Sequence, residues 1–372
     1  MTSERSLSLS KGRLRTNWNR LNGPDRIAGV DLARGLAVIG MFAAHLLITA
    51  DGFVWGDPTS WTALVDGRSS ILFATLAGVS IGLVTGGPTP LGRRQMSAAR
   101  GRLAVRAGIL LVLGILLILT GVPVYVILPA YAILFLIALP FTRMPARAVL
   151  GTAAGLAIVM PFVQPALNGL PIWQIPFGGE IDAFLGWHYP FTVWIAFVLA
   201  GVGVARAGIT RLRTQIGMLI AGGALAAVGY GLAELPPPSA DPYWWSVWTA
   251  EPHSSGVLEV IGSGGFAIAV LAVCLLVCRA AVVKAVVLPV RATGAMPLTA
   301  YTVQLVVWAA VALALFGDTS DLFGFRELEP FWPLTIGVLI GCTAWALLVG
   351  RGPLEWLLDR SARAAVSSPR PT

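Results

Sequence analysis

The chain has 372 residues, of which 56% are hydrophobic and 12% are charged, and its formal net charge is +8. Soluble globular proteins carry about 25% charged residues and about 45–50% apolar ones, so this composition excludes a soluble enzyme. The basic residues are sorted by connecting segment rather than gathered with aromatic residues on one surface, and we therefore expect no nucleic-acid partner.

Apolar runs of roughly 20 residues, the length that a helix needs to cross a membrane, recur along the whole chain. We predict an all-α, polytopic transmembrane helical bundle of about ten spans. Residues 1–28 are expected to form a disordered basic cytoplasmic tail, residues 29–350 a single transmembrane helical domain, and residues 351–372 a cytoplasmic C-terminal tail. The expected spans are 29–50, 68–86, 103–120, 122–141, 149–167, 191–207, 214–232, 256–278, 295–316 and 331–349.

The distribution of basic residues predicts the orientation in the membrane. Of the 26 Lys and Arg residues, 23 lie in the two tails and on every second connection between spans; the other three are Arg34, Arg68 and Arg326. By the positive-inside rule both termini are cytoplasmic. The opposite connections are longer, acidic and rich in tryptophan, and functional residues tend to lie in such loops.

The first span carries three ionisable residues on one face. At 100° per residue Asp31, Arg34 and His45 fall within about 60° of one another, and Arg34 and His45 are separated by roughly 16 Å of helix rise. Asp31 and Arg34 are either a mutual i, i+3 ion pair or a site at which Arg34 binds a phosphate or carboxylate from the cytoplasm. His45 is either a neutral, hydrogen-bonded histidine or a group for proton transfer or nucleophilic attack.

Asp66 and Arg68 mark the predicted outer start of the second span. Asp66 can cap that helix while Arg68 extends outward, which would be a purely structural arrangement. Alternatively, Asp66 can orient a catalytic histidine, and Arg68 can bind an anionic ligand. The residue types do not decide between these two interpretations.

A third polar cluster precedes the eighth span. Glu251, His253 and the serines at 254–255 are followed by Glu259, so a base with an orienting carboxylate can form there. Equally, one of the serines can cap the helix, with Glu259 in its first turns. His188 is a further imidazole on the same predicted side. No spacing of these residues is typical of a metal site, so we expect no metal.

Four segments, at residues 31–41, 61–78, 189–206 and 294–304, resemble those of a known family, the heparan-alpha-glucosaminide N-acetyltransferase-like membrane proteins. Residues 31–41 resemble the family's D-x-x-R-G-x-x-x-x-x-M opening, and residues 61–78 resemble its entry to the second span. Residues 189–206 resemble the Y-P-x-x-x-W … G-x-x-x-x-R stretch of bacterial members. Residues 294–304 resemble the G-x-M-x-L-T-x-Y-x-x-Q segment of bacterial relatives of unknown function.

The resemblance implies a multi-pass enzyme of the bacterial plasma membrane that takes an acetyl or other acyl group from cytoplasmic acyl-CoA. The acceptor would be an amino or hydroxyl group of an extracytoplasmic glycan or lipid-linked sugar. The family's catalytic histidine lies just ahead of the tryptophan that resembles Trp61, but residues 57–60 contain no histidine in this chain. His45 or His253 would then have to take its role.

These observations give a preferred hypothesis and a rival one. In the preferred one, a membrane-bound acyltransferase uses His45 or His253 as general base or acyl carrier, oriented by Asp66 or Glu251. Arg34, Asp31 and Arg68 would form the acyl-CoA site. Membrane lipids are expected partners, and a homodimer is compatible with this hypothesis. The rival hypothesis is a transporter or flippase of a small anion or lipid, with the polar face of the first span lining its path.

Overall fold

The computed structural model describes residues 12, 14–23, 26–50, 52–54 and 56–367. Regular secondary structure in these residues is helical, and they contain no strand. The prediction of an all-α protein is therefore confirmed. Residues 1–11 of the predicted disordered tail lie outside the described residues.

The apolar helices coincide with the predicted spans. Eight helices are long and apolar enough to cross a membrane, and the shorter apolar helices Leu128–Arg143 and Phe191–Ala207 lie at the fourth and sixth predicted spans. A helix thus lies at each of the ten predicted positions. The chain is a multi-pass helical bundle, and the cytoplasmic placement of both termini stays a prediction.

The helices group into two compact units. Unit 1 comprises Met1–Val65 and Val273–Leu358, and unit 2 comprises Asp66–Ala272 and Asp359–Thr372. Two helices, α11 (Val257–Val277) and α17 (Pro353–Ala365), begin in one unit and end in the other. Both units take residues from the range 29–350, for which we predicted a single domain.

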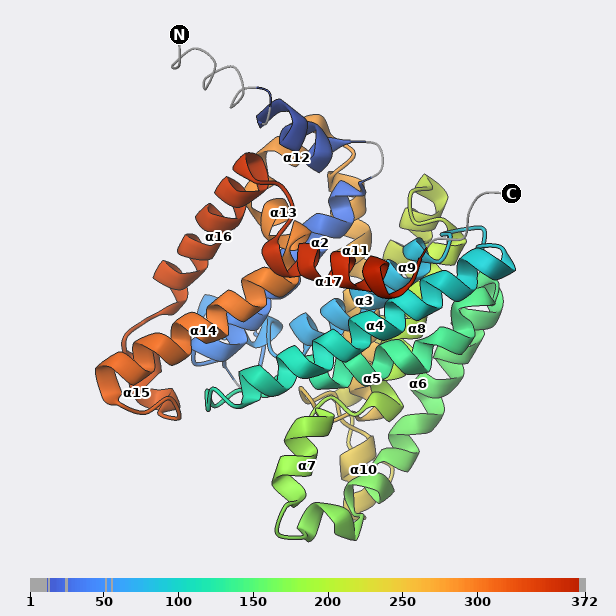
Figure 1. Cartoon of the computed structure of the whole chain (residues 1–372). Helices are drawn as coiled ribbons and strands as arrows, with labels where there is room; N and C mark the ends of the chain where they lie inside the picture. The colour runs from blue at the N-terminus through green and yellow to red at the C-terminus, as the bar shows by residue number, and fades with distance from the viewer. Residues whose placement is uncertain (1–11, 13, 24–25, 51, 55, 368–372) are drawn as a thin grey trace. The chain divides into compact units, whose positions relative to one another are not determined.

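Close contact between two helix backbones organises unit 1. Helix α13 packs along α2 because Gly294 lies directly against the Asp31 carbonyl and Gly35 against the Val290 carbonyl, so that neither position has room for a Cβ atom. Figure 1 shows α13 beside α2, and the approach of Gly294 to Asp31 places the contact at the end of α2 that carries this aspartate. The elements wholly in unit 1 are α2 (Ala28–Leu46), η1 (Pro58–Leu64), α12 (Ala281–Val286), α13 (Leu288–Ala295), α14 (Pro297–Phe316), α15 (Leu322–Glu327) and α16 (Phe331–Leu348).

Residues 14–22 are helical, although we expected a disordered tail up to residue 28. Tertiary contacts explain the difference. Leu21 is only 4% exposed, and the Asn17 side chain donates a hydrogen bond of 2.9 Å to the Leu347 carbonyl at the end of α16. Burial of Leu21 and a partly buried hydrogen bond therefore order a segment whose sequence is basic and polar.

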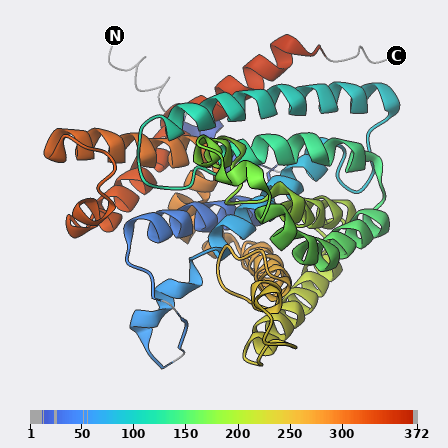
Figure 2. The same cartoon turned by 90° about the horizontal axis from the view of Figure 1, so that it is seen from below.

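The connection after α2 extends away from the end of that helix, as Figure 2 shows for residues 47–50, 52–54 and 56–65. Asp57 caps the 3-10 helix η1 by accepting hydrogen bonds from the backbone N–H and the hydroxyl of Thr59. Ser60 bonds back to Val54 through its hydroxyl. These residues form a folded turn at the place where the family's catalytic histidine would lie.

Glycines also bring the central helices of unit 2 together. Gly78 of α3 lies against the Val198 carbonyl of α8, and Gly201 of α8 lies against the Thr75 carbonyl of α3. Helix α6 packs along α8, and α4 packs along α5 (Figure 1). The elements wholly in unit 2 are α3 (Arg68–Val84), α4 (Arg93–Ile118), α5 (Leu128–Ala138), η2 (Leu139–Arg143), α6 (Ala146–Asn168), η3 (Pro171–Gln174), α7 (Gly178–Leu185), α8 (Phe191–Ala207), α9 (Leu212–Ala233) and α10 (Pro242–Val247).

Arg206, from the segment that resembles the family's arginine motif, is buried in unit 2 with 4% exposure. Its guanidinium donates to the Gly82 carbonyl at 3.0 Å, to the Thr85 hydroxyl at 2.7 Å and to the Thr142 carbonyl. These bonds satisfy carbonyl groups near the C-terminal end of α3 and in η2. Arg206 therefore joins α8 to the C-terminal end of α3, which is the end of α3 opposite Asp66.

Candidate functional site

A histidine and an aspartate that are far apart in the sequence meet in unit 2. His253 lies in the loop before α11, and Asp66 lies just before α3. The His253 Nε2 atom is 3.6 Å from Asp66 Oδ1, and the two side chains are 18% and 37% exposed, respectively. This separation allows a charge interaction but is long for a hydrogen bond. The pair places a candidate base beside a carboxylate that can orient it.

The loop that carries His253 is held by the buried carboxylate of Glu259. Glu259 lies in the first turn of α11 and is 3% exposed. Its Oε1 accepts the His253 backbone N–H at 2.7 Å, and its Oε2 accepts the Ser255 N–H at 2.7 Å and the Ser254 hydroxyl at 3.2 Å. A glutamate in the first helical turn that bonds back to preceding N–H groups is a form of capping box. In this loop the same bonds also fix the backbone of His253.

The backbone of this loop is strained at two residues. His253 has φ of 62° and Ser255 has φ of 57°, a region that residues other than glycine rarely adopt. Each such residue costs on the order of 1–3 kcal/mol, and the strain persists only where surrounding contacts determine it. The hydrogen bonds accepted by Glu259 hold the loop in this strained conformation.

Aromatic rings surround the His253 imidazole. The His188 ring centroid lies 4.5 Å from that of His253, and the Tyr189 centroid lies 5.5 Å from it. Tyr125 stacks on the other imidazole of this group, His188, with centroids 3.6 Å apart and planes 4° apart. Burial, and then the neighbouring His253, lower the pKa of His188 to about 3. His188 is therefore neutral near pH 7 and adds no positive charge beside His253.

The second ring nitrogen of His253 is buried. Its Nδ1 atom finds no hydrogen-bond partner among the residues that the structure describes. When Nε2 carries the proton and faces Asp66, Nδ1 holds a lone pair. A buried, unpartnered lone pair on an oriented imidazole is suited to accepting a proton from a substrate.

Arg68 lies at the same end of α3 as Asp66. Its Nε donates a hydrogen bond of 2.7 Å to the Tyr230 hydroxyl, and its guanidinium carbon lies 4.8 Å from the centre of the Tyr230 ring. The Tyr230 hydroxyl is 2.9 Å from Ser263 Oγ on α11. Arg68 thus places a fixed positive charge two residues from Asp66 along the chain.

Glu251, the other carboxylate predicted to orient a histidine, is exposed. Its backbone N–H donates to the Thr249 hydroxyl at 3.0 Å, and its carbonyl accepts the Ser254 hydroxyl at 2.7 Å. These contacts are made by the backbone, whereas Asp66 approaches His253 with its carboxylate. The structure therefore favours Asp66 over Glu251 as the partner of His253.

His45 lies in unit 1, in the last turn of α2. Its Nδ1 atom is 3.3 Å from Oε1 of Gln304 on α14, and its ring meets Tyr301 edge-on with centroids 6.3 Å apart. Arg326 donates to the carbonyls of Ala44 and His45 and so caps the helix end. His45 thus contacts an amide, whereas His253 contacts a carboxylate.

The other end of α2 carries the predicted ion pair. Asp31 is 2% exposed, and its Oδ1 lies 3.5 Å from NH1 of Arg34, which confirms the i, i+3 contact. A stronger partner was not predicted: Arg26 Nε lies 2.5 Å from Asp31 Oδ2. The side chains of Arg34 and Arg26 are 20% and 27% exposed, so neither side chain is fully enclosed by the protein.

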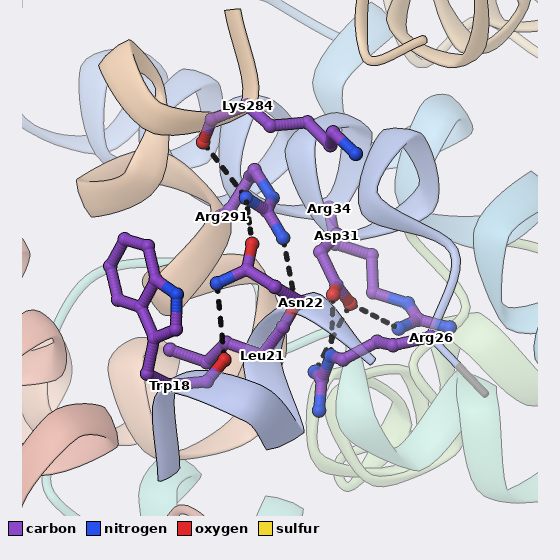
Figure 3. Close-up of polar contacts among 8 residues, drawn as sticks. All are labelled: Trp18, Leu21, Asn22, Arg26, Asp31, Arg34, Lys284 and Arg291. Carbon is purple, nitrogen blue, oxygen red and sulfur yellow. Dashed lines mark hydrogen bonds and ion pairs between the residues drawn. The ribbon is translucent and has the colours of Figure 1, made fainter. Parts of the chain in front are cut away.

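A buried arginine, Arg291, lies beside this ion pair, as Figure 3 shows. Arg291 is 1% exposed and donates to the Leu21 carbonyl at 2.8 Å, to the Asn22 side-chain oxygen at 3.1 Å and to the Lys284 carbonyl at 2.8 Å. The Asn22 amide group in turn donates to the Trp18 carbonyl at 3.1 Å. Unit 1 therefore gathers Arg26, Arg34 and Arg291 around the buried carboxylate of Asp31.

Metal ligation finds no support in the described part of the chain, where no three His, Cys, Asp or Glu side chains are grouped to hold an ion. The chemistry of the candidate site consists of a histidine, two carboxylates, an arginine and hydroxyl groups. Such a set is suited to proton transfer and to stabilising negative charge.

Sequence reasoning placed Glu259 in the third cluster but did not assign it a role in the site. Its position six residues after His253, in a first helical turn, was the available signal. His188 was recognised as an outer imidazole, but nothing in the sequence shows that it contacts His253. Gln304, Arg26 and Arg291 were not singled out as partners of the predicted residues.

The two parts of this site lie in segments that match different family models. Residues 26–230, more than half of the chain, match the model described as heparan-alpha-glucosaminide N-acetyltransferase, catalytic. Residues 204–364 match a protein of unknown function (DUF418). Asp66 thus lies in the first segment, and His253 and Glu259 lie in the second. None of the curated proteins matches the chain. The extent of the first match shows that the chain belongs to the heparan-alpha-glucosaminide N-acetyltransferase-like family of membrane proteins.

Proposed function

We propose that the chain is an acyltransferase of the bacterial plasma membrane that moves an acyl group, with acetyl as the first candidate, from cytoplasmic acyl-CoA. The acceptor is an amino or hydroxyl group of an extracytoplasmic glycan or lipid-linked sugar. The observation that carries this proposal is the contact of His253 with Asp66 on a loop held in a strained conformation.

In this proposal His253 is the general base. Asp66 holds the proton on Nε2, and Nδ1 accepts the proton of the acceptor as its oxygen or nitrogen attacks the thioester carbonyl carbon. The carbon–sulfur bond then breaks, and the proton passes from Nδ1 to the departing CoA thiolate. No further reactant is needed, and the imidazole returns to its neutral form.

We assign the arginines to binding the negatively charged groups of the donor. Arg34, held by Asp31 and partly exposed beside Arg26, is the candidate for the CoA phosphates, because guanidinium groups bind phosphate in a bidentate manner. Arg68 is fixed by Tyr230 close to Asp66 and is assigned to an anionic group of the bound donor. His45, on the same helix as Arg34, carries no acyl group in this direct transfer.

The test is transfer of radioactive acetyl from labelled acetyl-CoA by the purified full-length protein in detergent, with amino sugars and lipid-linked sugars as acceptors. We expect saturable binding of acetyl-CoA and label in the acceptor. If no acyl-CoA binds or transfers, the proposal is wrong. Movement of a small anion or lipid across vesicles that contain the protein, in the absence of any acyl donor, would instead support the rival transport function.

A further inference from the structure

The loop that carries His253 concentrates backbone strain. Among the described residues, three that are not glycine have positive φ, and two of them, His253 and Ser255, lie in this one loop. A loop that only connects α10 to α11 has no need of such conformations. Strain of this kind gathers where a side chain must be held in a defined direction.

One carboxylate accepts three hydrogen bonds from this loop. Glu259 accepts two backbone N–H groups and one hydroxyl, and all three donors lie within residues 253–255. An ionised carboxylate has about four acceptor sites and no donor, so it can accept all three bonds at once. The Glu259 backbone N–H bonds to the Thr249 carbonyl at 2.9 Å, and this bond fixes the helix end from which the carboxylate reaches.

The same carboxylate lies against the segment that carries Asp66. Gly67 has φ of 63°, and a Cβ atom there would lie 3.1 Å from Cβ of Pro252 and 3.5 Å from Oε1 of Glu259. The backbone next to Asp66 therefore touches both the loop and its carboxylate. This contact sets the position of Asp66 relative to His253.

We infer that Glu259 is a positioning residue that fixes the His253 imidazole opposite Asp66 through its bonds to the His253 and Ser255 backbone. This inference rests on the proposed function of His253 as the base. Glu259 itself is 3% exposed, and its carboxylate is occupied by the loop, so it acts through His253 and not on the substrate.

Substitution of Glu259 by Gln tests the hydrogen bonds to the loop while the length of the side chain stays the same. The amide keeps the side-chain length, but its NH₂ group is a donor and must face either the His253 N–H or the Ser255 N–H. We expect kcat for acyl transfer to fall about 10²-fold, with the KM for acyl-CoA unchanged, because a small misplacement of a reacting group has an effect of this order. Glu259→Asp keeps the carboxylate and should recover part of the loss.

A second readout reports on the imidazole without the reaction. We would measure the rate at which diethyl pyrocarbonate modifies His253 in the full-length protein in detergent, with each histidine followed by mass spectrometry. In Glu259→Gln the loop is released, so modification of His253 should accelerate severalfold while that of His45 stays unchanged. Glu180→Gln is the matched control, because Glu180 is an exposed carboxylate in the first turn of another helix of unit 2.

The outcomes separate this inference from the proposed function. If Glu259→Gln, folded by size-exclusion chromatography, leaves both kcat and the modification of His253 unchanged, the inference is wrong. If Glu259→Gln does not fold, Glu259→Asp decides in the same way, since its shorter carboxylate must alter the modification rate when the position matters. If no variant transfers acyl groups but the modification of His253 still changes, the positioning role stands and the acyltransferase function does not.

Discussion

The two candidate histidines occupy contrasting environments. His45 lies in a regular helix of unit 1 and contacts the amide of Gln304. His253 lies in a strained loop of unit 2 and contacts the carboxylate of Asp66. A helix places a side chain at no conformational cost, whereas this loop needs Glu259 to hold it. The two imidazoles therefore differ in their polar partner, and the carboxylate beside His253 can stabilise the charge that forms when an imidazole accepts a proton.

The largest effect should separate these two histidines. We expect His253→Ala to lower acyl transfer about 10²- to 10⁴-fold, the usual contribution of a general acid–base group. His45→Ala should have a much smaller effect on the initial rate, because the proposed transfer runs directly from the thioester to the acceptor. Steady-state transfer of labelled acetyl measures both. Equal losses in the two variants would contradict the distinction drawn between them.

The ion pair of unit 1 should matter for stability. Asp31→Asn removes the charge that faces two arginines, and we expect unfolding to become easier by about 2 kcal/mol, less than for a fully buried pair because both arginines are partly exposed. Thermal unfolding in detergent measures the change. Asp318→Asn is a control on an exposed aspartate of the same unit, for which a change within about 0.5 kcal/mol is expected. Equal effects of the two substitutions would refute the assignment of Asp31.

His188 should make the stability of unit 2 depend on pH. Its pKa in the folded chain is about 3, whereas an unperturbed histidine has 6.5. Between these values the unfolded chain binds a proton that the folded chain does not, so stability falls as the pH decreases from 6.5 toward 3. In His188→Phe an aromatic ring still packs against Tyr125, but the side chain has no group that binds a proton. Its melting temperature should decline less between pH 7 and pH 4.5, and identical slopes would contradict the account.

The smallest expected effect tests the strain directly. Ser255→Gly places a glycine at φ of 57°, and we expect a gain in stability of about 1 kcal/mol or less. Ser255→Ala keeps a Cβ atom at the same φ and should bring no such gain. Thermal unfolding of both variants distinguishes relief of strain from loss of the hydroxyl group. A gain in the alanine variant alone would show that strain is not the cause.

The parts of the fold that depend on local pattern were predictable from the sequence. Apolar run length located a helix at each of the ten predicted spans, and helical period placed Asp31 beside Arg34. The helix at residues 14–22 was missed because contacts with distant residues such as Leu347 order it. Local pattern cannot contain that information.

The sequence identified the residues of the candidate site but did not show which of them contact one another. His253 and Asp66 were both candidates, but 187 residues separate them, and Asp66 competed with Glu251, which is only two residues away from His253. The sequence gives no reason to choose between the two carboxylates. Tertiary structure decides the matter because Gly67 lies against Pro252 and Glu259, which brings Asp66 to the loop.

The most direct test of the account is a double-mutant cycle on acyl transfer with His253→Ala, Asp66→Asn and the two combined. If Asp66 acts only by orienting His253, the double variant should be no slower than His253→Ala alone, because residues that act as a unit are not additive. If the two losses multiply, Asp66 and His253 act independently. That result would contradict the claim that they form one catalytic pair.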